Sequence, residues 1–596
     1  MAAVALIVLG LGLWQSRSLG ADLARPTSTR GSEYVGSSAC RRCHQDNHDS
    51  WGRTFHRTMT QEASARSVVG DFAEARFVYG GITATMSNDD GRYWMRFSRH
   101  PDGPPDPDAW SAEVVRTVGS HRYQQYLARA GDTWSRLPVA WDIEAGRWMH
   151  MNGGFLTPDP PGLGAEAPID RADYDRHVTR WNDNCVFCHN VDAAPGKHAA
   201  GFDTRVSELG IACEACHGPG SEHIALNTNP VRRYALHLSG EADPTIASPD
   251  RMTPERSSQI CGQCHGQRLT KNIAEVLQHG DAYLPGEDLS KFSKPLARDT
   301  TLNSVPGTFA PRFWPDGTAR LTAYEYQGLL QSACAMDGEL SCGSCHTMHG
   351  GDPRGQLRTG PQDDAMCTDC HAELAGADAQ RAHSHHAPDG AGGRCVSCHM
   401  PRVVYGIVRA HRSHRIDSPR PDLAPKDSRP DACTLCHLDR TRGWAATETK
   451  RLWPASAGAA SAAAVAEFAE TDVPEVMRLL LAGDPVEHAI AADALGHSLD
   501  ARTAAPQRVG LLLDTMADDP YPAVRTIASR SLARLMRDAG HPAPPAFDAT
   551  AGAAARARHA QRVATALPAA AIERPPAALT QRLRAKARAV AIEIGE

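Results

Sequence analysis

One five-residue pattern, Cys-x-x-Cys-His, occurs eight times and uses sixteen of the seventeen cysteines. The two thiols of such a pattern form thioethers with the vinyl groups of a c-type haem, and the histidine then binds the iron. We number the motifs 1 to 8 in chain order. Their cysteine pairs are Cys40/Cys43, Cys185/Cys188, Cys213/Cys216, Cys261/Cys264, Cys342/Cys345, Cys367/Cys370, Cys395/Cys398 and Cys433/Cys436. The pattern predicts eight covalent haem c groups with the proximal ligands His44, His189, His217, His265, His346, His371, His399 and His437.

Zinc sites and disulfides are the alternatives for so many cysteines. A structural zinc site needs two further ligands from a second half-site, and zinc coordination does not require a histidine after every second cysteine. Haem is therefore the favoured interpretation. Aromatic residues make up only 6% of the chain. Because haems are large apolar plates, we expect them to replace side chains in the interior and to leave short helices and long loops around them.

The formal charge of −6 and the absence of a long basic run argue against nucleic acid as a partner. Haem is attached outside the bacterial cytoplasm, so we expect an exported protein of the periplasm or cell envelope. Residues 1–21 contain an apolar run of signal-sequence length, without a preceding basic residue. We interpret it as a signal peptide, with a retained membrane anchor as the alternative.

Residues 74–151 contain no haem motif. Three short segments in it, 75–79, 82–87 and 93–98, are rich in β-branched and aromatic residues, and an Asn-Asp-Asp-Gly turn signal separates the last two. We predict a small antiparallel β-sheet inserted between motifs 1 and 2, in a fold that is otherwise mainly α-helical and irregular.

Several segments resemble the cytochrome c-554 family and related bacterial multihaem cytochromes. These segments are 51–56, 210–223, 345–349 and 414–421, and the resemblance covers roughly residues 34–445. It implies an octahaem domain, often followed by TPR or HEAT repeats. It also motivates a set of distal iron ligands, in part through position near the motifs: His56, His177, His223, His349, His383, His385, His411 and His414.

Cysteine disappears after Trp453 and alanine dominates. Two similar segments carry Asp-Pro pairs at 484 and 519, which resembles HEAT repeats. We predict HEAT-like helices over 455–540, then a linker at 541–575 and a basic C-terminal helix within 541–596. The repeats either dock a partner or pack against the haem domain.

The leading hypothesis is an electron-transfer cytochrome whose partners are redox proteins, such as a membrane quinol oxidoreductase or other cytochromes. Histidine on both sides of an iron suits electron transfer, whereas an open side allows ligand chemistry. The alternative is therefore an octahaem oxidoreductase with one open haem, acting on hydroxylamine, nitrite, tetrathionate or a similar compound. A repeat scaffold with structural haem ranks last. Met336 and Met348 could bind iron through their thioethers, but a packing role is favoured for both. Cys334, the unpaired cysteine, is interpreted as a buried free thiol.

Overall fold

The computed structural model describes residues 33–164, 168–338, 340–358, 364–423, 429–454, 473–497, 505–587 and 592. The predicted signal segment, 1–21, lies outside these residues, as do 455–472 and 498–504 of the predicted repeat region. Among the described residues, no helix combines the length and the apolar character that a membrane span requires.

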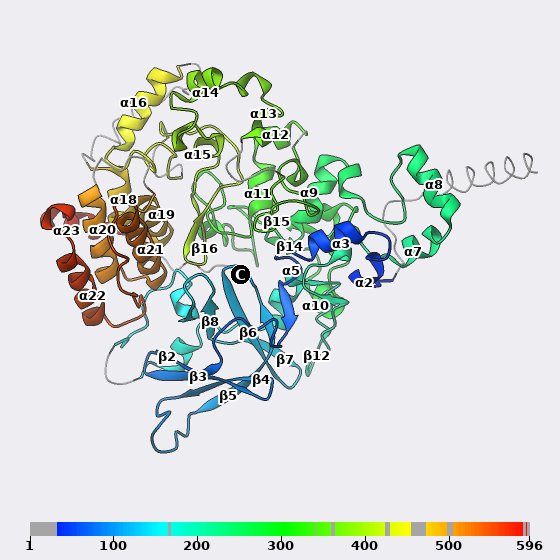
Figure 1. Ribbon diagram of the computed structural model, residues 1–596, viewed down its shortest axis with the longest axis horizontal. Helices are drawn as coiled ribbons and strands as arrows, with labels where there is room; N and C mark the ends of the chain where they lie inside the picture. Colours follow the sequence, from blue (N-terminus) through cyan, green and yellow to red (C-terminus); the bar gives the residue numbers. More distant parts are fainter. Residues whose placement is uncertain are drawn as a thin grey trace, which may run out of the picture.

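A nine-stranded antiparallel sheet occupies the N-terminal part of the chain, at the bottom of Figure 1. Seven strands form the order β2-β3-β4-β5-β6-β8-β9, while β1 pairs with β5 and β7 pairs with β6. The strands are β1 (Thr60–Glu62), β2 (Ala73–Tyr79), β3 (Ile82–Asp89), β4 (Arg92–Ser98), β5 (Trp110–Val118), β6 (Tyr123–Ala130), β7 (Thr133–Arg136), β8 (Val139–Asp142) and β9 (Arg147–His150).

The predicted hairpin between β3 and β4 is confirmed. Asp90 and Gly91 connect the strands with φ values of 54° and 83°, and Asp89 pairs with Arg92 across them. Two positive φ angles are the mark of a type I′ turn, whose twist matches that of the strands it joins. The Asp-Gly pair thus fixes the register of the sheet at this point.

The sheet is larger than the small insertion that the sequence predicted. Strand β6, which the sequence analysis did not recognise, buries Gln124. The side-chain amide of Gln124 donates to the backbone oxygen of Ser67 at 2.7 Å and accepts from the backbone N–H of Val69 at 2.8 Å. A buried polar residue breaks the alternation that identifies a strand. One face of the sheet carries an aromatic core in which Phe72 contacts Tyr93, Tyr126 and Trp148 edge to face.

Short helices joined by long loops surround the motifs, as expected for a haem-centred fold. They are α2 (Ser37–Cys40), α3 (Gln45–Trp51), α4 (Arg171–Tyr174), α5 (Val186–His189), α6 (Cys213–His217), α7 (Ser221–Asn227), α8 (Pro230–Ser239), α9 (Pro254–Gly262), α10 (Ile273–His279), α11 (Glu325–Leu330), α12 (Ala333–Met336), α13 (Ala365–Thr368), α14 (Ala377–Ser384), α15 (Cys395–His399) and α16 (Arg442–Leu452). The two-stranded sheets β10 (Asn190–Val191) with β13 (Glu208–Leu209), β11 (Lys197–His198) with β12 (Gly201–Phe202), β14 (Arg268–Thr270) with β15 (Ser293–Pro295), and β16 (Val404–Gly406) with β17 (Arg409–His411) lie among them.

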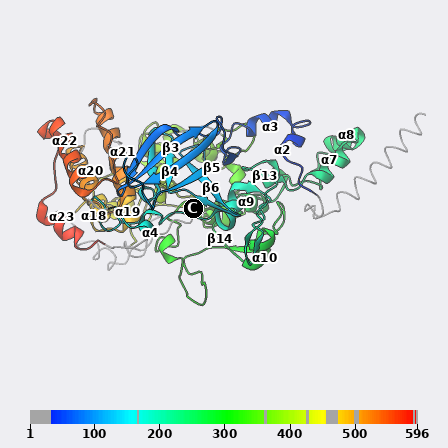
Figure 2. The same ribbon diagram turned by 90° about the horizontal axis from the view of Figure 1, so that it is seen from below.

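The C-terminal region is helical. Figure 2 shows it at one end of the molecule, with α7 and α8 at the other. Its helices are α18 (Glu475–Ala482), α19 (Pro485–Leu495), α20 (Ala505–Asp518), α21 (Pro522–Asp538), α22 (Ala553–Ala566) and α23 (Ala577–Arg584). The predicted linker at 541–575 is wrong where α22 lies, because its alanines and arginines favour a helix and its nearest prolines stand outside it. The predicted basic helix at 579–594 ends early, at Arg584.

The C-terminal helices pack against the rest of the chain and share one hydrophobic core with it. This core joins residues of α18 to α22 to Leu321 and Tyr405 of the motif-bearing region. Arg530 of α21 donates to the Asp142 carboxylate at 2.5 Å and to the Val408 carbonyl at 3.1 Å. Of the two roles considered for this region, packing is therefore observed.

Candidate functional site

Each Cys-x-x-Cys-His motif includes a helical turn. The histidine N–H donates to the carbonyl of the first cysteine in His44 (3.0 Å), His265 (2.9 Å) and His437 (2.8 Å), and α6 and α15 each consist of one complete motif. Residues three apart lie on the same side of such a turn, so the two thiols of a motif face the same way. None of the seventeen cysteines forms a disulfide.

Two motif cysteines, Cys43 and Cys370, are exposed, whereas the other motif cysteines are half-buried. Cys43 and Cys370 share their position within the motif. Each is the second cysteine of its motif and lies in a turn just after a four-residue helix, α2 for Cys43 and α13 for Cys370. The spacing of a motif decides which two thiols face one haem, but it does not decide how deep the motif lies in the fold.

Six motif histidines face a second histidine across a gap. The ring centroids are 6.0 to 6.5 Å apart in the pairs His44–His223, His217–His349, His265–His56, His346–His414, His399–His383 and His437–His386. Two imidazoles bonded to one metal ion from opposite sides, each at about 2 Å, place their centroids roughly 6 Å apart. The spacing of these pairs thus fits two axial ligands of one haem iron.

The other ring nitrogen of several motif histidines is anchored. Nδ1 lies 2.7 Å from the Ala247 carbonyl in His217, 3.0 Å from the Gly355 carbonyl in His346 and 3.0 Å from the Asp417 carbonyl in His399. A carbonyl only accepts hydrogen bonds, so Nδ1 carries the proton and Nε2 keeps the lone pair that a metal needs.

In two further histidines of the six pairs, Nδ1 lies near a carboxylate. Asp243 Oδ2 lies 3.1 Å from Nδ1 of His223, and Glu325 Oε2 lies 3.6 Å from Nδ1 of His265. Burial alone would raise the pKa of Glu325, but the contact with His265 outweighs it and lowers the pKa to about 2. Burial, with help from the nearby His265, lowers the pKa of His56 to about 4, which favours the neutral, metal-binding form of the ring.

Five of the eight sequence-predicted distal residues lie in these pairs: His56, His223, His349, His383 and His414. The other three lie elsewhere. His177 stacks on Phe155 at 4.0 Å, His385 packs edge-on against Trp453 at 4.9 Å, and His411 lies 3.1 Å from the guanidinium of Arg122.

Sequence reasoning missed His386, the ring that faces His437. Helix α14 ends at Ser384, and His385 takes the left-handed conformation with φ of 57° directly after it. This reversal sends His385 and His386 to different neighbours. The dense group of histidines at 383–386 indicated that distal ligands lie in this segment, but it did not indicate which ring would face which motif.

Two motif histidines remain without such a partner. In the described part of the chain, neither His189 nor His371 faces a histidine ring at this spacing. The ring of His189 is buried, and burial, with His265 and Arg136 nearby, lowers its pKa to about 4. The side chain of His371 is 56% exposed, and its Nδ1 lies 3.6 Å from the carboxylate of Glu373.

Cysteines of different motifs meet and give the spatial order of the attachment sites. The thiols touch in four pairs, Cys40/Cys213, Cys188/Cys264, Cys261/Cys342 and Cys367/Cys395. Weaker electrostatic interactions link Cys216/Cys264, Cys345/Cys370 and Cys398/Cys433. The motifs therefore form a row in the order 1, 3, 4, 5, 6, 7, 8. Motif 4 also contacts motif 2, and we call it the junction motif.

The weaker ligand candidates lie outside the histidine pairs. Met336 is 68% exposed, and the sulfur of Met348 accepts from the side-chain amide of Gln356 at 3.1 Å. Cys334 is half-buried rather than fully buried, and it lies near Cys345, as the charge interaction between the two thiols shows.

Two family models match parts of the chain. The doubled CXXCH motif matches residues 335–376, which contain motifs 5 and 6, and the model of cytochrome c554 and c-prime matches residues 166–218, which contain motifs 2 and 3. Both agree with the geometry of thiols and histidines described above.

Two known proteins are similar to the chain. Multiheme cytochrome MtrA of Shewanella baltica (strain OS185) is 23% identical over 248 residues, which are 40% of this chain; the chain spans 65% of the length of that relative. The crystal structure of the outer cell wall cytochrome OcwA aligns with a TM-score of 0.44 and 17% identity, over 84% of this chain and 100% of that one. The repeated motifs, the two family models and the similarity to MtrA together identify this chain as a multihaem c-type cytochrome.

Proposed function

We propose that this chain carries electrons through eight covalently attached haems. The observation that carries the proposal is the row of attachment sites, in which cysteines of neighbouring motifs lie next to one another. When bound, haem supplies an iron centre that gains or loses one electron. A row of such centres whose attachment points touch would give electrons short steps from motif 1 to motif 8.

The histidine pairs favour electron transfer over chemistry at the iron. In this proposal, His223 is the distal ligand at motif 1, His349 at motif 3, His56 at motif 4, His414 at motif 5, His383 at motif 7 and His386 at motif 8. Two histidines close both faces of an iron, so a small molecule finds no vacant position there.

The proposal includes the setting of the protein. It places the octahaem unit at residues 34–445, with 74–151 as an insertion, and the HEAT-like helices at 455–540. It places the protein in the periplasm or envelope, because haem attachment follows export, and assigns residues 1–21 to a signal peptide or anchor. Its partners would be a membrane quinol oxidoreductase or other cytochromes.

The test is a haem count combined with a redox titration of the purified protein. Mass spectrometry of the intact chain should find eight haems, and proteolysis should find each on its own cysteine pair. The spectrum should titrate reversibly over a wide range of potential, with low-spin bands throughout. A mature chain with unmodified thiols at several motifs would contradict the proposal.

A second candidate function rests on motif 2. His189 faces no histidine ring at the axial spacing in the described residues, and the motif is entered through the π-helical turn Trp181–Cys185, a feature common at functional sites. We propose that, if the iron here has a vacant position, the protein reduces or oxidises a small nitrogen or sulfur compound. EPR of the ferric protein with and without nitrite or hydroxylamine tests it. A high-spin signal that shifts on addition supports the oxidoreductase, whereas only unshifted low-spin signals exclude it.

A further inference from the structure

The junction motif has a half-buried carboxylate behind its histidine. Glu325 is the first residue of α11, and its Oε2 lies 3.6 Å from Nδ1 of His265. Among the described residues, this buried oxygen has no hydrogen-bond partner of normal geometry. In the described part of the chain, the ion-pair contact recorded for this oxygen is the one with His265, at the junction motif.

This anchor differs from the other motif anchors in charge. At motifs 3, 5 and 7, Nδ1 faces a neutral backbone carbonyl. At motif 6 a carboxylate stands at the same 3.6 Å, and the two histidines are similarly exposed. The Glu373 side chain is 70% exposed, however, against 27% for Glu325, so water screens the charge of Glu373 more strongly. Of the two proximal histidines with a carboxylate at 3.6 Å, His265 thus has the less exposed one; the distal ring His223 has another, Asp243, at 3.1 Å.

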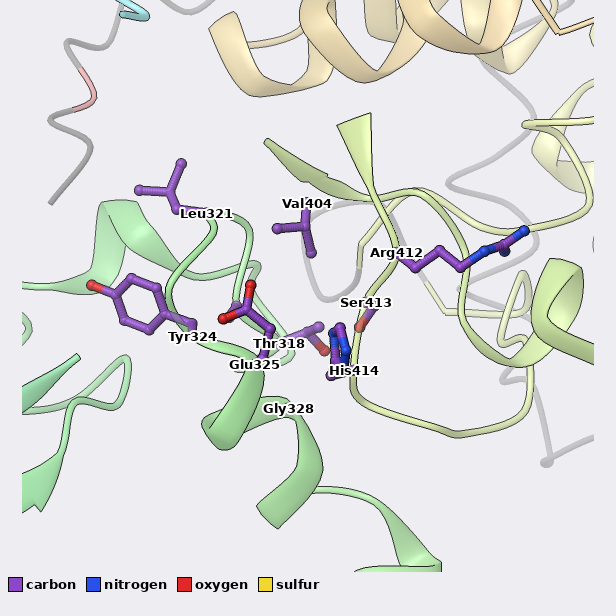
Figure 3. A pocket seen from close by; sticks show the side chains of 10 residues that line it. Thr318, Leu321, Tyr324, Glu325, Gly328, Val404, Arg412, Ser413 and His414 are labelled. Atoms are coloured by element: carbon purple, nitrogen blue, oxygen red, sulfur yellow. The ribbon is translucent and has the colours of Figure 1, made fainter. Parts of the chain in front are cut away.

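The carboxylate of Glu325 borders a small cavity. Figure 3 shows Glu325 and His414 lining one cavity with Leu321 and Val404. Arg412 also lines it, but its guanidinium donates to the backbone oxygens of Val396 at 2.6 Å and Met400 at 3.1 Å. The negative charge therefore acts mainly on His265 and, more weakly, on His414, which faces motif 5.

We propose that Glu325 lowers the reduction potential of the haem at the junction motif. The proposal deepens the electron-transfer function and rests on it. A negative charge close to Nδ1 of an axial histidine makes the ligating nitrogen more basic, which stabilises the ferric iron. Glu325 is thus a positioning and tuning residue.

The test compares two isosteric variants of the holoprotein, Glu325→Gln and Glu373→Gln. Each removes one carboxylate that stands 3.6 Å from a motif histidine, one with a half-buried side chain and one with an exposed side chain. In a spectroelectrochemical titration, Glu325→Gln should shift one component, equal to a single haem, to higher potential. It should also change the g-values of one low-spin ferric EPR signal. Glu373→Gln should shift its component by much less.

Haem content and low-spin character are measured first, on wild type and variants. A wild-type chain without haem at Cys261 and Cys264 would contradict the electron-transfer proposal itself. A fully loaded Glu325→Gln protein with an unchanged titration and EPR spectrum would overturn only the role of Glu325. Loss of haem in both Glu325→Gln and Glu325→Asp would also overturn it, because the residue would then serve assembly.

Discussion

The buried ion pair between Arg320 and Asp484 should carry much of the attachment of the C-terminal helices. Arg320 Nη1 donates to Asp484 Oδ2 at 2.6 Å, and both side chains are 7% exposed. Asp484 also begins α19: its Oδ1 accepts from the backbone N–H groups of Val486 at 3.0 Å and Glu487 at 3.2 Å. One carboxylate therefore serves as an ion-pair partner and as a helix cap.

Two substitutions separate these roles. Asp484→Asn keeps a capping oxygen but leaves Arg320 buried without its counter-ion, which costs about 3–5 kcal/mol. We expect the lower end, about 3 kcal/mol, because Arg320 Nε still donates to the Pro311 carbonyl at 2.8 Å. Asp484→Ala also removes the cap, which adds about 1 kcal/mol.

The assay is urea unfolding of the holoprotein followed by far-UV circular dichroism, with haem content matched between samples. Asp514→Asn is the control, since the 2.8 Å pair of Asp514 with Arg574 has side chains 28% and 47% exposed. Such a pair contributes less than about 1 kcal/mol. If Asp484→Asn were no more destabilising than Asp514→Asn, the reasoning from burial would be refuted.

Two further predictions follow from single contacts. His386→Ala should convert one low-spin haem into a high-spin one by removing the ring opposite His437, whereas His385→Ala should leave the EPR spectrum unchanged; the reverse result would contradict the pairing. Burial alone would lower the pKa of His488, but the Asp519 carboxylate 2.8 Å away raises this pKa above 6.5. The stabilisation from the charged His488 ring is therefore fully present below about pH 6.5 and is lost as the pH rises through the folded-state pKa. Unfolding midpoints measured against pH should show this loss in wild type, and Asp519→Asn should abolish it.

The motifs and their local structure could be predicted from the sequence because the chemistry of attachment fixes a spacing along the chain. The β3–β4 turn could be predicted for a similar reason, since Asp90 and Gly91 favour positive φ. Both features depend on residues within a few positions of one another.

The remaining features depend on contacts between distant segments. Glu325 meets His265 across sixty residues, and no spacing rule connects them. The difference between His385 and His386 rests on one left-handed residue at the end of α14. Strand β6 was missed because Gln124 is buried through hydrogen bonds to the segment before β2, which a single-strand pattern cannot reveal.

The pairing of histidines also sets an order of assembly. Motif 1 is synthesised first, yet His44 meets His223, which follows 179 residues later; His265 meets His56 over a similar span. Near the end of the chain the spans are short, with His383 only 16 residues before His399. Since long loops close more slowly than short ones, the sites made last should finish first. The earliest motifs should therefore meet their second histidine only after the later segments have folded.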